Sequence, residues 1–395
     1  MPPTSAEPAR TSSFRWLGSA FYLFSFLASG AYMPFLFVYF IELGITGQQI
    51  GWISILSPLM MLLLATPIAS LADRRRWRVR ILQIALAGQA GMMFVLSLPR
   101  SFGWIAACML ILAILVSPIM SVTDSLVARM AQRLGIDFGG MRLWGSIGYA
   151  VSALGFGALW GFVGFAPMFV VGPLFLLPLL WLAGRFEEPP SSDVQARQPT
   201  LALLRAPGLF LLLSATFLAA ISNSLSMTFG GIYARFLGGG DLLIGLMIAF
   251  SATSEIVTMY LSERLQEWLG GKPQALLAAY GLMAVGYLGW MLVPNATALL
   301  AFSIIKGLGY GLWLTVTVRM TVERTPEARA ATAQSFLAVS MFGLAPLIAG
   351  PVGGWIHDAY GAGAVFGLGV LALGLAALIV TLPALRAPKA PQPAP

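Results

Sequence analysis

The sequence has few charged residues, one cysteine and one histidine, and each shortage excludes a class of protein. Only 10% of its 395 residues are Asp, Glu, Lys or Arg, against about 25% in soluble globular proteins. Because Cys108 is the single cysteine, an intrachain disulfide and a cysteine-built metal site are excluded. His357 is also alone, so the sequence contains no histidine cluster that would bind a metal. We therefore expect no bound cofactor and no metal site.

The sequence consists largely of long hydrophobic runs. Hydrophobic residues make up 58% of the chain, and the mean hydropathy is +0.85. A helix needs about 20 apolar residues to cross a bilayer. The sequence therefore predicts an all-α integral membrane protein with twelve transmembrane helices, near residues 14–41, 49–71, 79–98, 103–130, 139–163, 166–184, 208–235, 242–263, 274–293, 297–320, 330–357 and 362–384.

The positions of lysine and arginine predict the orientation of these spans. If the N-terminus is cytoplasmic, all of the 23 cations except Arg100, Arg235 and Lys306 lie in cytoplasmic loops or at cytoplasmic helix ends. Such an excess is typical of cytoplasmic loops. We therefore expect a multi-pass protein of a bacterial-type inner membrane with both termini inside. Headgroups of the lipid bilayer account for the net charge of +8, so no nucleic acid is expected as a partner.

The spans divide into two sets of six, joined by a polar, proline-containing linker. Short basic loops follow both the second and the eighth span, which indicates that the halves are related. An internal repeat in a membrane protein is typical of transporters whose solute site lies where the repeats meet. We expect a monomer with the following parts: a disordered tail 1–13, a six-helix bundle 14–184, a cytoplasmic linker 185–206, a second six-helix bundle 207–385 and a disordered tail 386–395.

Four ionisable residues lie inside the predicted spans, namely Asp124, Arg142, Glu255 and Lys306. A charge at this depth costs roughly 2.5–3.5 kcal/mol on insertion scales, so it faces a partner or a water-filled cavity. The polar faces of several spans are therefore predicted to line a central aqueous cavity. Two alternatives remain open at this point. Asp124 and Arg142 would merely neutralise each other during insertion, and the serine-rich faces would only pack helices together.

Polar and aromatic side chains recur at helical spacing near these charges. Arg142 and Lys306 are expected to hold an anionic or hydroxyl-rich group, and the aromatic residues to stack on a ring or sugar face. The predicted solute-binding set is Arg142, Asp124, Lys306, Tyr149, Trp144, Ser146, Asn223, Tyr310, Trp313 and Tyr22.

Glycine-rich runs in two spans predict close helix packing. The first run contains Gly145, Gly148, Gly155, Gly157 and Gly161, and a dinucleotide-binding function is excluded because no strand precedes it. The second run, Gly350-Pro351 with Gly353-Gly354, is expected to bend and pack its helix. His357 and Asp358 at the outer end of this span are expected to form an interfacial pair rather than a proton relay.

The loop after the second span carries Asp73-Arg74-Arg75-Arg76-Trp77-Arg78. It resembles the loop 2 to 3 signature of the major facilitator superfamily, G-x-x-x-D-[RK]-x-G-[RK]-[RK]. Ala69 replaces the first glycine of the signature, and Arg76 occupies the second glycine position. The resemblance implies that Asp73, Arg74 and Arg78 gate a conformational change through contacts that form in one state only. An ordinary positive-inside anchor is the alternative.

A sharper resemblance covers residues 117–149, with Thr123-Asp124-Ser125-Leu126, Asp137-Phe138-Gly139 and Arg142-Leu143-Trp144-Gly145-Ser146. The segment resembles the phenylpropionate permease family and, more distantly, the lactose permease and nucleoside-proton symporter group. In the lactose permease group, an acidic residue on helix 4, an arginine on helix 5 and a glutamate on helix 8 bind solute or couple it to protons. These positions resemble Asp124, Arg142 and Glu255. Lys306 matches a helix 10 lysine, whereas Gly309 and Leu312 replace the histidine and glutamate of that helix.

The resemblance implies a secondary active transporter, not an enzyme, with the proton gradient as its energy source. Its partners would be a proton and a small-molecule solute, for which an aromatic carboxylate, a sugar and a nucleoside are all compatible. Glu255 and Asp124 are the expected proton-coupling residues in symport by alternating access. The first alternative is a proton-coupled exporter of drugs or sugars, although span 5 lacks the G-P-x-x-G-G element of antiporters. A membrane enzyme or receptor is the distant alternative.

Overall fold

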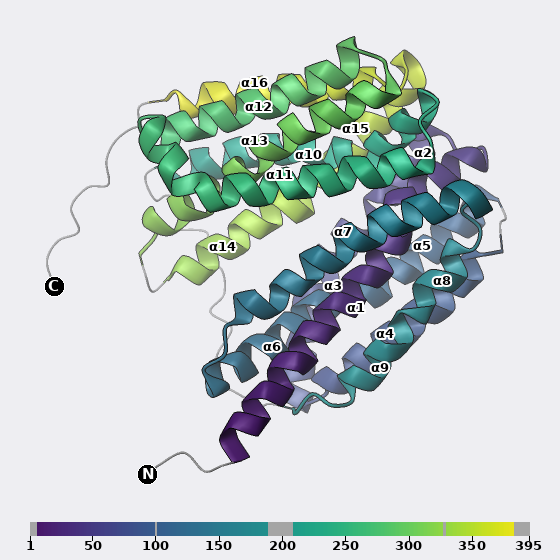
Figure 1. Ribbon diagram of the computed structural model, residues 1–395, viewed down its shortest axis with the longest axis vertical. Helices are drawn as coiled ribbons and strands as arrows, with labels where there is room; N and C mark the ends of the chain where they lie inside the picture. Colours follow the sequence, from purple (N-terminus) through teal and green to yellow (C-terminus); the bar gives the residue numbers. More distant parts are fainter. Residues whose placement is uncertain (1–5, 99–100, 189–207, 327–328, 383–395) are drawn as a thin grey trace, which may run out of the picture. The chain divides into compact units, whose positions relative to one another are not determined.

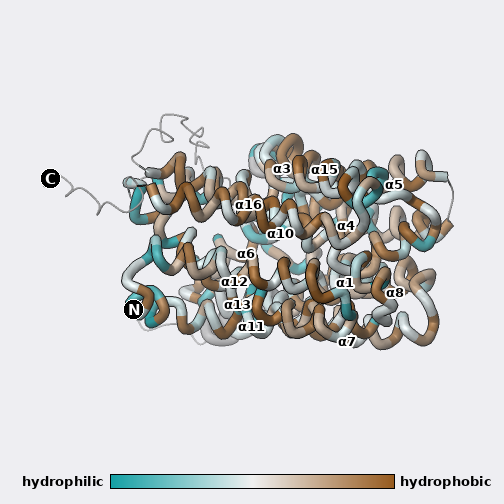
Figure 2. Tube along the Cα trace, turned by 90° about the horizontal axis from the view of Figure 1, so that it is seen from above, coloured by the Kyte–Doolittle hydropathy of each residue, from teal (hydrophilic) through white to brown (hydrophobic). Residues whose placement is uncertain are grey.

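The computed structural model describes residues 6–98, 101–188, 208–326 and 329–382, which form helices joined by short connections (Figure 1). Ten helical segments are long and apolar enough to cross a membrane, and two shorter apolar segments, Met168–Ala183 and Ala364–Val380, bring the total to twelve. Within these ranges no residue is in a strand. Hydrophobic residues dominate the helices (Figure 2). The predicted all-α fold with twelve spans is confirmed.

The helices of the N-terminal half correspond to the first six spans. They are α1 (Ala6–Glu42), α2 (Gly47–Ser54), α3 (Leu56–Arg75), α4 (Arg78–Leu96), α5 (Phe102–Val116), α6 (Ile119–Leu134), α7 (Phe138–Val163), α8 (Met168–Leu174) and α9 (Leu176–Ala183). Helix α1 begins at Ala6, inside the tail for which disorder is expected, so residues 6–13 differ from that expectation. Most of the predicted linker, residues 189–206, and the predicted tail 386–395 lie outside the described residues.

The helices of the C-terminal half correspond to the last six spans. They are α10 (Leu209–Phe236), α11 (Asp241–Trp268), α12 (Lys272–Leu292), α13 (Ala296–Glu323), α14 (Ala330–Ala338), the π-helix Val339–Leu344, α15 (Ala345–Tyr360) and α16 (Ala364–Val380). The π-helix and α15 continue α14 as one span. Pro346 is the second residue of α15, where its missing backbone donor interrupts the regular hydrogen-bond ladder.

Three spans of the N-terminal half are broken into two helices, and each break precedes or includes a proline. The α2–α3 break falls at Ile55, three residues before Pro58, and the α8–α9 break falls at Phe175, three residues before Pro178. Pro118 begins α6 in the same way. A proline ring clashes with the carbonyl four residues earlier and donates no hydrogen bond. Pro58 and Pro178 therefore lie within the first turn of the second helix and Pro118 at its N-cap, where an amide has no helical acceptor.

The described residues fall into two compact units that largely follow the two halves. Among the described residues, unit 1 comprises 6–45, 56–98, 101–188 and 240–246, and unit 2 comprises 46–55, 208–239, 247–326 and 329–382. Two segments pack with the opposite half of the chain. The segment that contains α2 packs within unit 2, and the first turns of α11 pack within unit 1.

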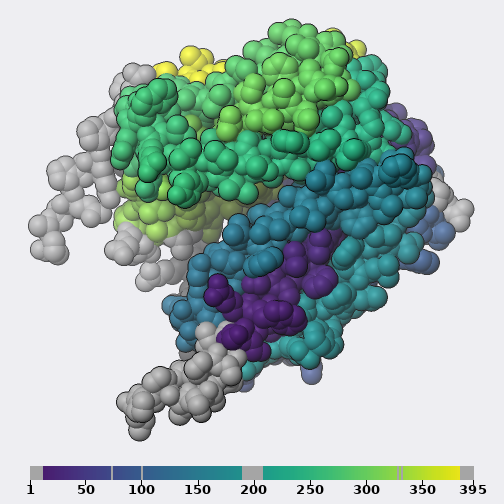
Figure 3. All heavy atoms as spheres, in the orientation of Figure 1, coloured from purple at the N-terminus to yellow at the C-terminus, as the bar shows by residue number. Residues whose placement is uncertain are grey.

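Helices α1 and α7 form the main packing contact of unit 1 and lie side by side (Figures 1 and 3). The Ser152 hydroxyl donates to the Leu27 carbonyl at 2.6 Å, and the Trp160 indole donates to the Ala31 carbonyl at 2.9 Å. Such bonds are possible because the glycines of α7 let the two backbones approach each other.

The five glycines predicted to pack α7 divide into two groups. Gly145 and Gly148 lie against α1, and Gly157 lies against the first turns of α11, so an added Cβ at any of the three would meet neighbouring atoms. Gly155 and Gly161 face open space. For these two the packing prediction was wrong, because they lie on the side of the helix that carries no neighbour.

Unit 2 is held together by α12 packed on α13 and by α10 packed on α16. Buried aromatic residues fill its interior: Trp290 contacts Phe366 edge to face at 5.0 Å between ring centroids, and Tyr287 stacks on Phe366 at 6.2 Å. The Trp290 indole donates to the Leu299 carbonyl, and the Tyr233 hydroxyl donates to the Trp290 carbonyl. These bonds satisfy polar groups that would otherwise be costly inside an apolar core.

Candidate functional site

In unit 1, Asp124 of α6, Arg142 of α7 and Tyr22 of α1 form one polar cluster. Two donors converge on the Asp124 carboxylate: the Tyr22 hydroxyl at 2.6 Å and the Arg142 guanidinium at 3.2 Å and 3.4 Å. The guanidinium also lies 5.9 Å from the centroid of the Tyr22 ring. The side chains of Arg142 and Asp124 remain 46% and 40% exposed. The ion pair is therefore accessible, and its atoms still have hydrogen-bonding capacity for a solute.

The connection between α6 and α7 explains why these two charges meet. Gly135 ends α6 with φ 63°, a left-handed conformation that glycine adopts without strain. Asp137 then caps α7, because its carboxylate accepts the amides of Gly139 and Gly140 at 2.9 Å each. The tight turn makes α6 and α7 antiparallel neighbours, and the long arginine side chain reaches the carboxylate on α6.

Ser146 and Tyr149 follow Arg142 on the same side of α7, at spacings of four and seven residues. Ser146 is exposed, and the Tyr149 ring lies edge to face with Phe26 at 6.5 Å. Trp144 is not brought to this cluster. It is 45% exposed and shares its side of α7 with the apolar residues Ile147 and Val151. Two residues along a helix rotate the side chain by about 200°, so Trp144 points away from Arg142, and its predicted role beside it requires correction.

In unit 2, Lys306 of α13 is 4% exposed and does not reach the surface. Its ammonium group donates to the Ser226 hydroxyl of α10 at 3.2 Å and lies 5.7 Å from the centroid of the Trp290 ring. Gly286 of α12 packs directly against the Lys306 stem. Lys306 is thus enclosed by protein groups in this state, unlike Arg142.

Glu255 lies on α11, on the stretch that packs against α13. Gly307 and Gly311 permit this contact: an added Cβ at Gly307 would meet Ser251 and Ser254, and one at Gly311 would meet Glu255 and Thr258. The Ser251 hydroxyl donates to Glu255 at 3.0 Å. Lys306 lies within electrostatic range of Glu255.

Three further predicted solute-binding residues of unit 2 occupy different environments. Asn223 is half-buried and lies one turn from Ser226 on α10. Tyr310 is half-buried and contacts Trp313 edge to face at 5.4 Å. Trp313 is fully buried, with its indole nitrogen among the buried polar atoms that have no hydrogen-bond partner among the described residues. The prediction that Trp313 stacks on a solute therefore requires correction, because no solute reaches a fully buried ring in this state.

The three residues of the predicted gating loop differ in how they are placed. The side chain of Asp73 lies outside the described residues. Arg74 is exposed, whereas Arg78 is 2% exposed at the beginning of α4 and interacts with other protein groups. Arg76 adopts φ 55°, which is the left-handed conformation that the glycine of the superfamily signature would adopt without strain.

Sequence reasoning missed two contacts of the cluster around the charges. Phe138 lies edge to face with Tyr22 at 6.2 Å, and its place one turn before Arg142 on α7 is the signal that would have identified it. Trp290 beneath Lys306 had no such signal, because it lies on a different helix from every predicted charge.

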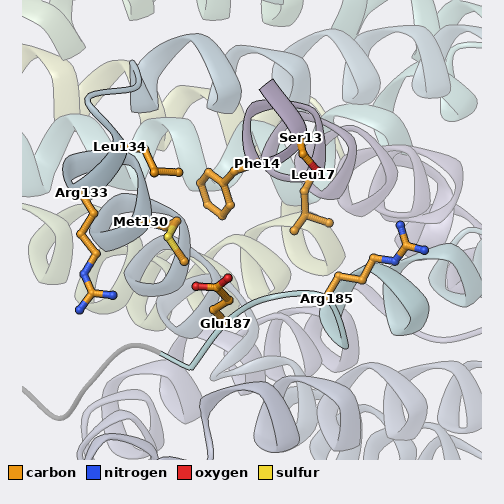
Figure 4. A pocket seen from close by; sticks show the side chains of 8 residues that line it. All are labelled: Ser13, Phe14, Leu17, Met130, Arg133, Leu134, Arg185 and Glu187. Carbon is orange, nitrogen blue, oxygen red and sulfur yellow. The ribbon is translucent and has the colours of Figure 1, made fainter. Parts of the chain in front are cut away.

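A cavity of about 250 Å³ lies elsewhere in unit 1 (Figure 4) and is lined by Ser13, Phe14, Leu17, Met130, Arg133, Leu134, Arg185 and Glu187. None of the predicted solute-binding residues lines it. The side chains of Arg133 and Arg185 extend to opposite sides, so the two guanidinium groups do not converge on a common anion. Arg185 instead lies 3.6 Å from the centroid of the Trp181 ring.

Comparisons with known proteins find similar proteins over most of the chain. A family model described as the MFS_1 like family matches residues 15–368. The maltose permease of Geobacillus stearothermophilus is 30% identical over 367 residues, which cover 90% of this chain and 92% of the permease. A probable 3-phenylpropionic acid transporter of Escherichia coli (strain K12) is 23% identical over 301 residues, or 73% of this chain and 76% of that protein. The crystal structure of the nucleoside transporter NupG has a TM-score of 0.77 at 17% identity and covers 93% of this chain and 97% of that chain, which shows the same fold.

Proposed function

This chain belongs to the MFS_1 like family of major facilitator superfamily transporters, and from that premise we propose that it imports a neutral, hydroxyl-rich solute of the oligosaccharide class together with a proton. The protein is a multi-pass membrane transporter of small molecules and not an enzyme. The identity of the solute, the proton coupling and the direction of transport are the proposal. It further holds that the protein acts as a monomer in a bacterial inner membrane, with both termini inside and no cofactor besides the proton gradient.

One observation carries the choice of solute: both cations assigned to solute binding already have partners. Arg142 is paired with Asp124 at 3.2 Å, so an incoming carboxylate would compete with a carboxylate that is already in place. Lys306 is buried against Ser226 and Trp290. A neutral polyol instead gains from both members of the Asp124–Arg142 pair, because hydroxyl groups donate to the carboxylate and accept from the guanidinium. The maltose permease similarity supports the same solute class.

The aromatic groups beside the pair suit a sugar as well. The Tyr22 ring contacts Phe138 and lies near the Arg142 guanidinium, but it is fully buried, so like Trp313 it does not contact a solute in this state. The half-buried Phe138 is the ring available beside the pair. Aromatic faces pack against the apolar face of a pyranose, while the surrounding polar groups bind its hydroxyls. An aromatic carboxylate such as 3-phenylpropionate would use the rings equally well but not the carboxylate of Asp124, and this difference allows the two solute classes to be separated.

Glu255 is the better candidate for proton coupling. Tyr22 and Arg142 both donate to Asp124, whereas the only hydrogen bond to the Glu255 carboxylate that the described residues show comes from Ser251. Asp124 is thus engaged by a cation and a hydroxyl, whereas the Glu255 carboxylate keeps more of its acceptor capacity for a proton. We therefore assign the transported proton to Glu255 and the solute to the Asp124–Arg142 pair.

Binding by the purified protein tests the solute class. We expect maltose or a related oligosaccharide to raise the thermal midpoint of the purified protein, and 3-phenylpropionate and nucleosides to leave it unchanged, because a ligand that binds only the folded state stabilises it. Arg142→Ala should abolish the shift. A shift with 3-phenylpropionate alone would overturn the assignment to a neutral polyol.

Reconstitution in liposomes tests the coupling separately. Glu255→Gln should retain solute exchange at equilibrium but lose accumulation driven by an imposed proton gradient, because only the second process requires proton release. The parent protein is the control in both assays. Equal loss of exchange and accumulation would place Glu255 in solute binding, and normal accumulation would exclude it from coupling.

A further inference from the structure

The N-terminus of α2 is bound by a carboxylate that lies 311 residues further along the sequence. Asp358, near the end of α15, accepts the Gly47 amide at Oδ1 and the Gln48 amide at Oδ2, both at 2.8 Å. The first amides of a helix have no acceptor within the helix, and the positive end of the helix dipole favours a negative charge. One carboxylate thus satisfies two such amides.

Glycines bring the two helices close enough for this contact. An added Cβ at Gly51 would meet the Gly350 carbonyl, and an added Cβ at Gly354 would meet the Gly47 carbonyl. The α2 and α15 backbones therefore touch at two points about one helical turn apart. Such close contact between small residues is a common mode of helix packing in membranes.

His357 contacts the same carboxylate oxygen that accepts the Gly47 amide. The imidazole Nδ1 lies 3.0 Å from Asp358 Oδ1, and the ring stacks on Phe229 of α10 at 5.8 Å between centroids. The prediction that His357 pairs with Asp358 is thus incomplete, because the Asp358 carboxylate also accepts two amides of α2.

Helix α2 does not need Asp358 in order to begin. Thr46 forms a complete capping box: its hydroxyl accepts the Gln49 amide at 3.2 Å, and the Gln49 side chain accepts the Thr46 amide at 3.0 Å. The capping box provides no acceptor for the amides of Gly47 and Gln48, and Asp358 accepts both. The carboxylate therefore contributes to docking α2 on α15 rather than to starting the helix.

We propose that Asp358 is a positioning residue of the transport cycle, which holds the first turn of α2 on α15 in the state described here and releases it when the transporter changes state. Residues 46–55 pack within unit 2, although the chain on either side belongs to unit 1. A rearrangement of the two units must therefore either move this segment with unit 2 or break its contacts, and two hydrogen bonds to one charge set the cost of breaking them. Only the kinetic consequence of this proposal rests on the proposed transport function, whereas the docking of α2 on α15 does not.

Thiol labelling measures the docking directly. Ser54 lies where α2 meets Gly350, and Cys108 is the only native cysteine and is buried. In a Cys108→Ser background, Ser54→Cys should react slowly with a membrane-impermeant maleimide. Adding Asp358→Asn should accelerate the reaction by about tenfold or more, since a hydrogen bond to a charged group contributes more than one to a neutral group. Asp358→Glu should restore part of the protection.

Two matched variants separate docking from helix formation. Gln48→Pro removes one of the two donors while leaving Asp358 in place, and proline is tolerated in a first helical turn; it should accelerate labelling severalfold. Thr46→Ala removes the capping box and leaves the docking bonds, so it should accelerate labelling less than Asp358→Asn does. Unchanged labelling in both Asp358→Asn and Gln48→Pro, or a larger effect of Thr46→Ala, would overturn the proposal.

The kinetic readout distinguishes positioning from a general loss of stability. Asp358→Asn should change the rate of solute exchange at saturation and leave solute affinity in the thermal-shift assay within about twofold, because the residue lies outside the solute cluster. A loss of solute binding that matches the loss of transport would overturn this assignment. The labelling assay requires no solute, so its outcome does not depend on whether the proposed oligosaccharide is correct.

Discussion

At the scale of single residues, Tyr22 connects the two members of the Asp124–Arg142 pair. Its hydroxyl donates to Asp124 at 2.6 Å while its ring lies beneath Arg142. We expect Tyr22→Phe to weaken oligosaccharide binding by about tenfold, because the ring remains and only a hydrogen bond to a charged acceptor is lost. Titration of the purified protein measures this affinity. Tyr260→Phe serves as the control, since Tyr260 is 86% exposed; equal affinities in both variants would exclude a role for the Tyr22 hydroxyl.

Arg76 provides a second prediction at this scale. It is the one residue other than glycine with a positive φ among the described residues, and it stands where the superfamily signature has glycine. A left-handed conformation costs roughly 1–2 kcal/mol for a residue with a Cβ, and the greater freedom of glycine in the unfolded chain offsets about half of this.

Arg76→Gly should therefore raise the free energy of unfolding by roughly 0.5–1 kcal/mol, which an increased thermal midpoint of the purified protein would reveal. Arg75→Gly is the matched control and should lower the midpoint, because Arg75 lies within α3, where glycine is unfavourable. A lower midpoint for Arg76→Gly would contradict the strain assigned to this residue.

The sequence was informative about which residues are charged within the membrane and less informative about where their neighbours point. Helical spacing places Ser146 and Tyr149 on the same side of α7 as Arg142, whereas Trp144, two residues after Arg142, lies on a different side. Trp313 was predicted to contact a solute because it follows Lys306 by seven residues and so shares its helix face, yet the ring is fully buried. Whether a side chain faces a solute or the helix behind it depends on the packing partner, and a single sequence contains no direct record of that partner.

At the scale of helices, Gly309 explains a departure from the lactose permease pattern. It stands where that group has a histidine, and an added Cβ would meet the Ala279 carbonyl and Met283 of α12. The contact between α12 and α13 therefore leaves no room for a side chain at this position.

We expect Gly309→Ala to destabilise the protein by about 1–3 kcal/mol through overpacking, and Gly309→His to prevent folding rather than to create a proton site. Gly281→Ala on α12 is the control. Gly281 faces open space, so alanine should be neutral or stabilising there. Thermal unfolding of the purified variants measures the difference, and an unchanged midpoint for Gly309→Ala would show that α12 and α13 can separate without cost.

The extent of the spans was predictable because length and hydropathy define a membrane helix largely by themselves. The breaks within the second, fourth and sixth spans fall at or just before Pro58, Pro118 and Pro178. Proline alone does not predict such a break, because Pro34, Pro67 and Pro351 lie inside unbroken helices. The packing of α2 within unit 2 was not predictable. It depends on contacts between Gly47 and Asp358, which are too far apart in the sequence for any local pattern to relate them.

At the scale of the whole molecule, the distribution of cations predicts which helix ends lie on each side of the membrane. The ends of α11 and α15 provide a matched pair, because Trp268 is 81% exposed and Tyr360 is 70% exposed. The positive-inside rule places Trp268, near Arg264 and Lys272, in the cytoplasm. An odd number of further crossings then places Tyr360 outside, together with Asp358 and the beginning of α2.

Single cysteines introduced at these two positions in a Cys108→Ser background test the orientation. In intact cells, an impermeant maleimide should label Tyr360→Cys and spare Trp268→Cys, and in inverted vesicles the preference should reverse. Permeabilised cells are the control, in which both positions should react because both are exposed. The reverse pattern in intact cells would place the termini outside and would move the Asp358 contact to the cytoplasmic face. Because α2 and α15 would remain docked in that case, the labelling of Ser54→Cys would be unaffected in detergent, and only the direction of transport would have to be reconsidered.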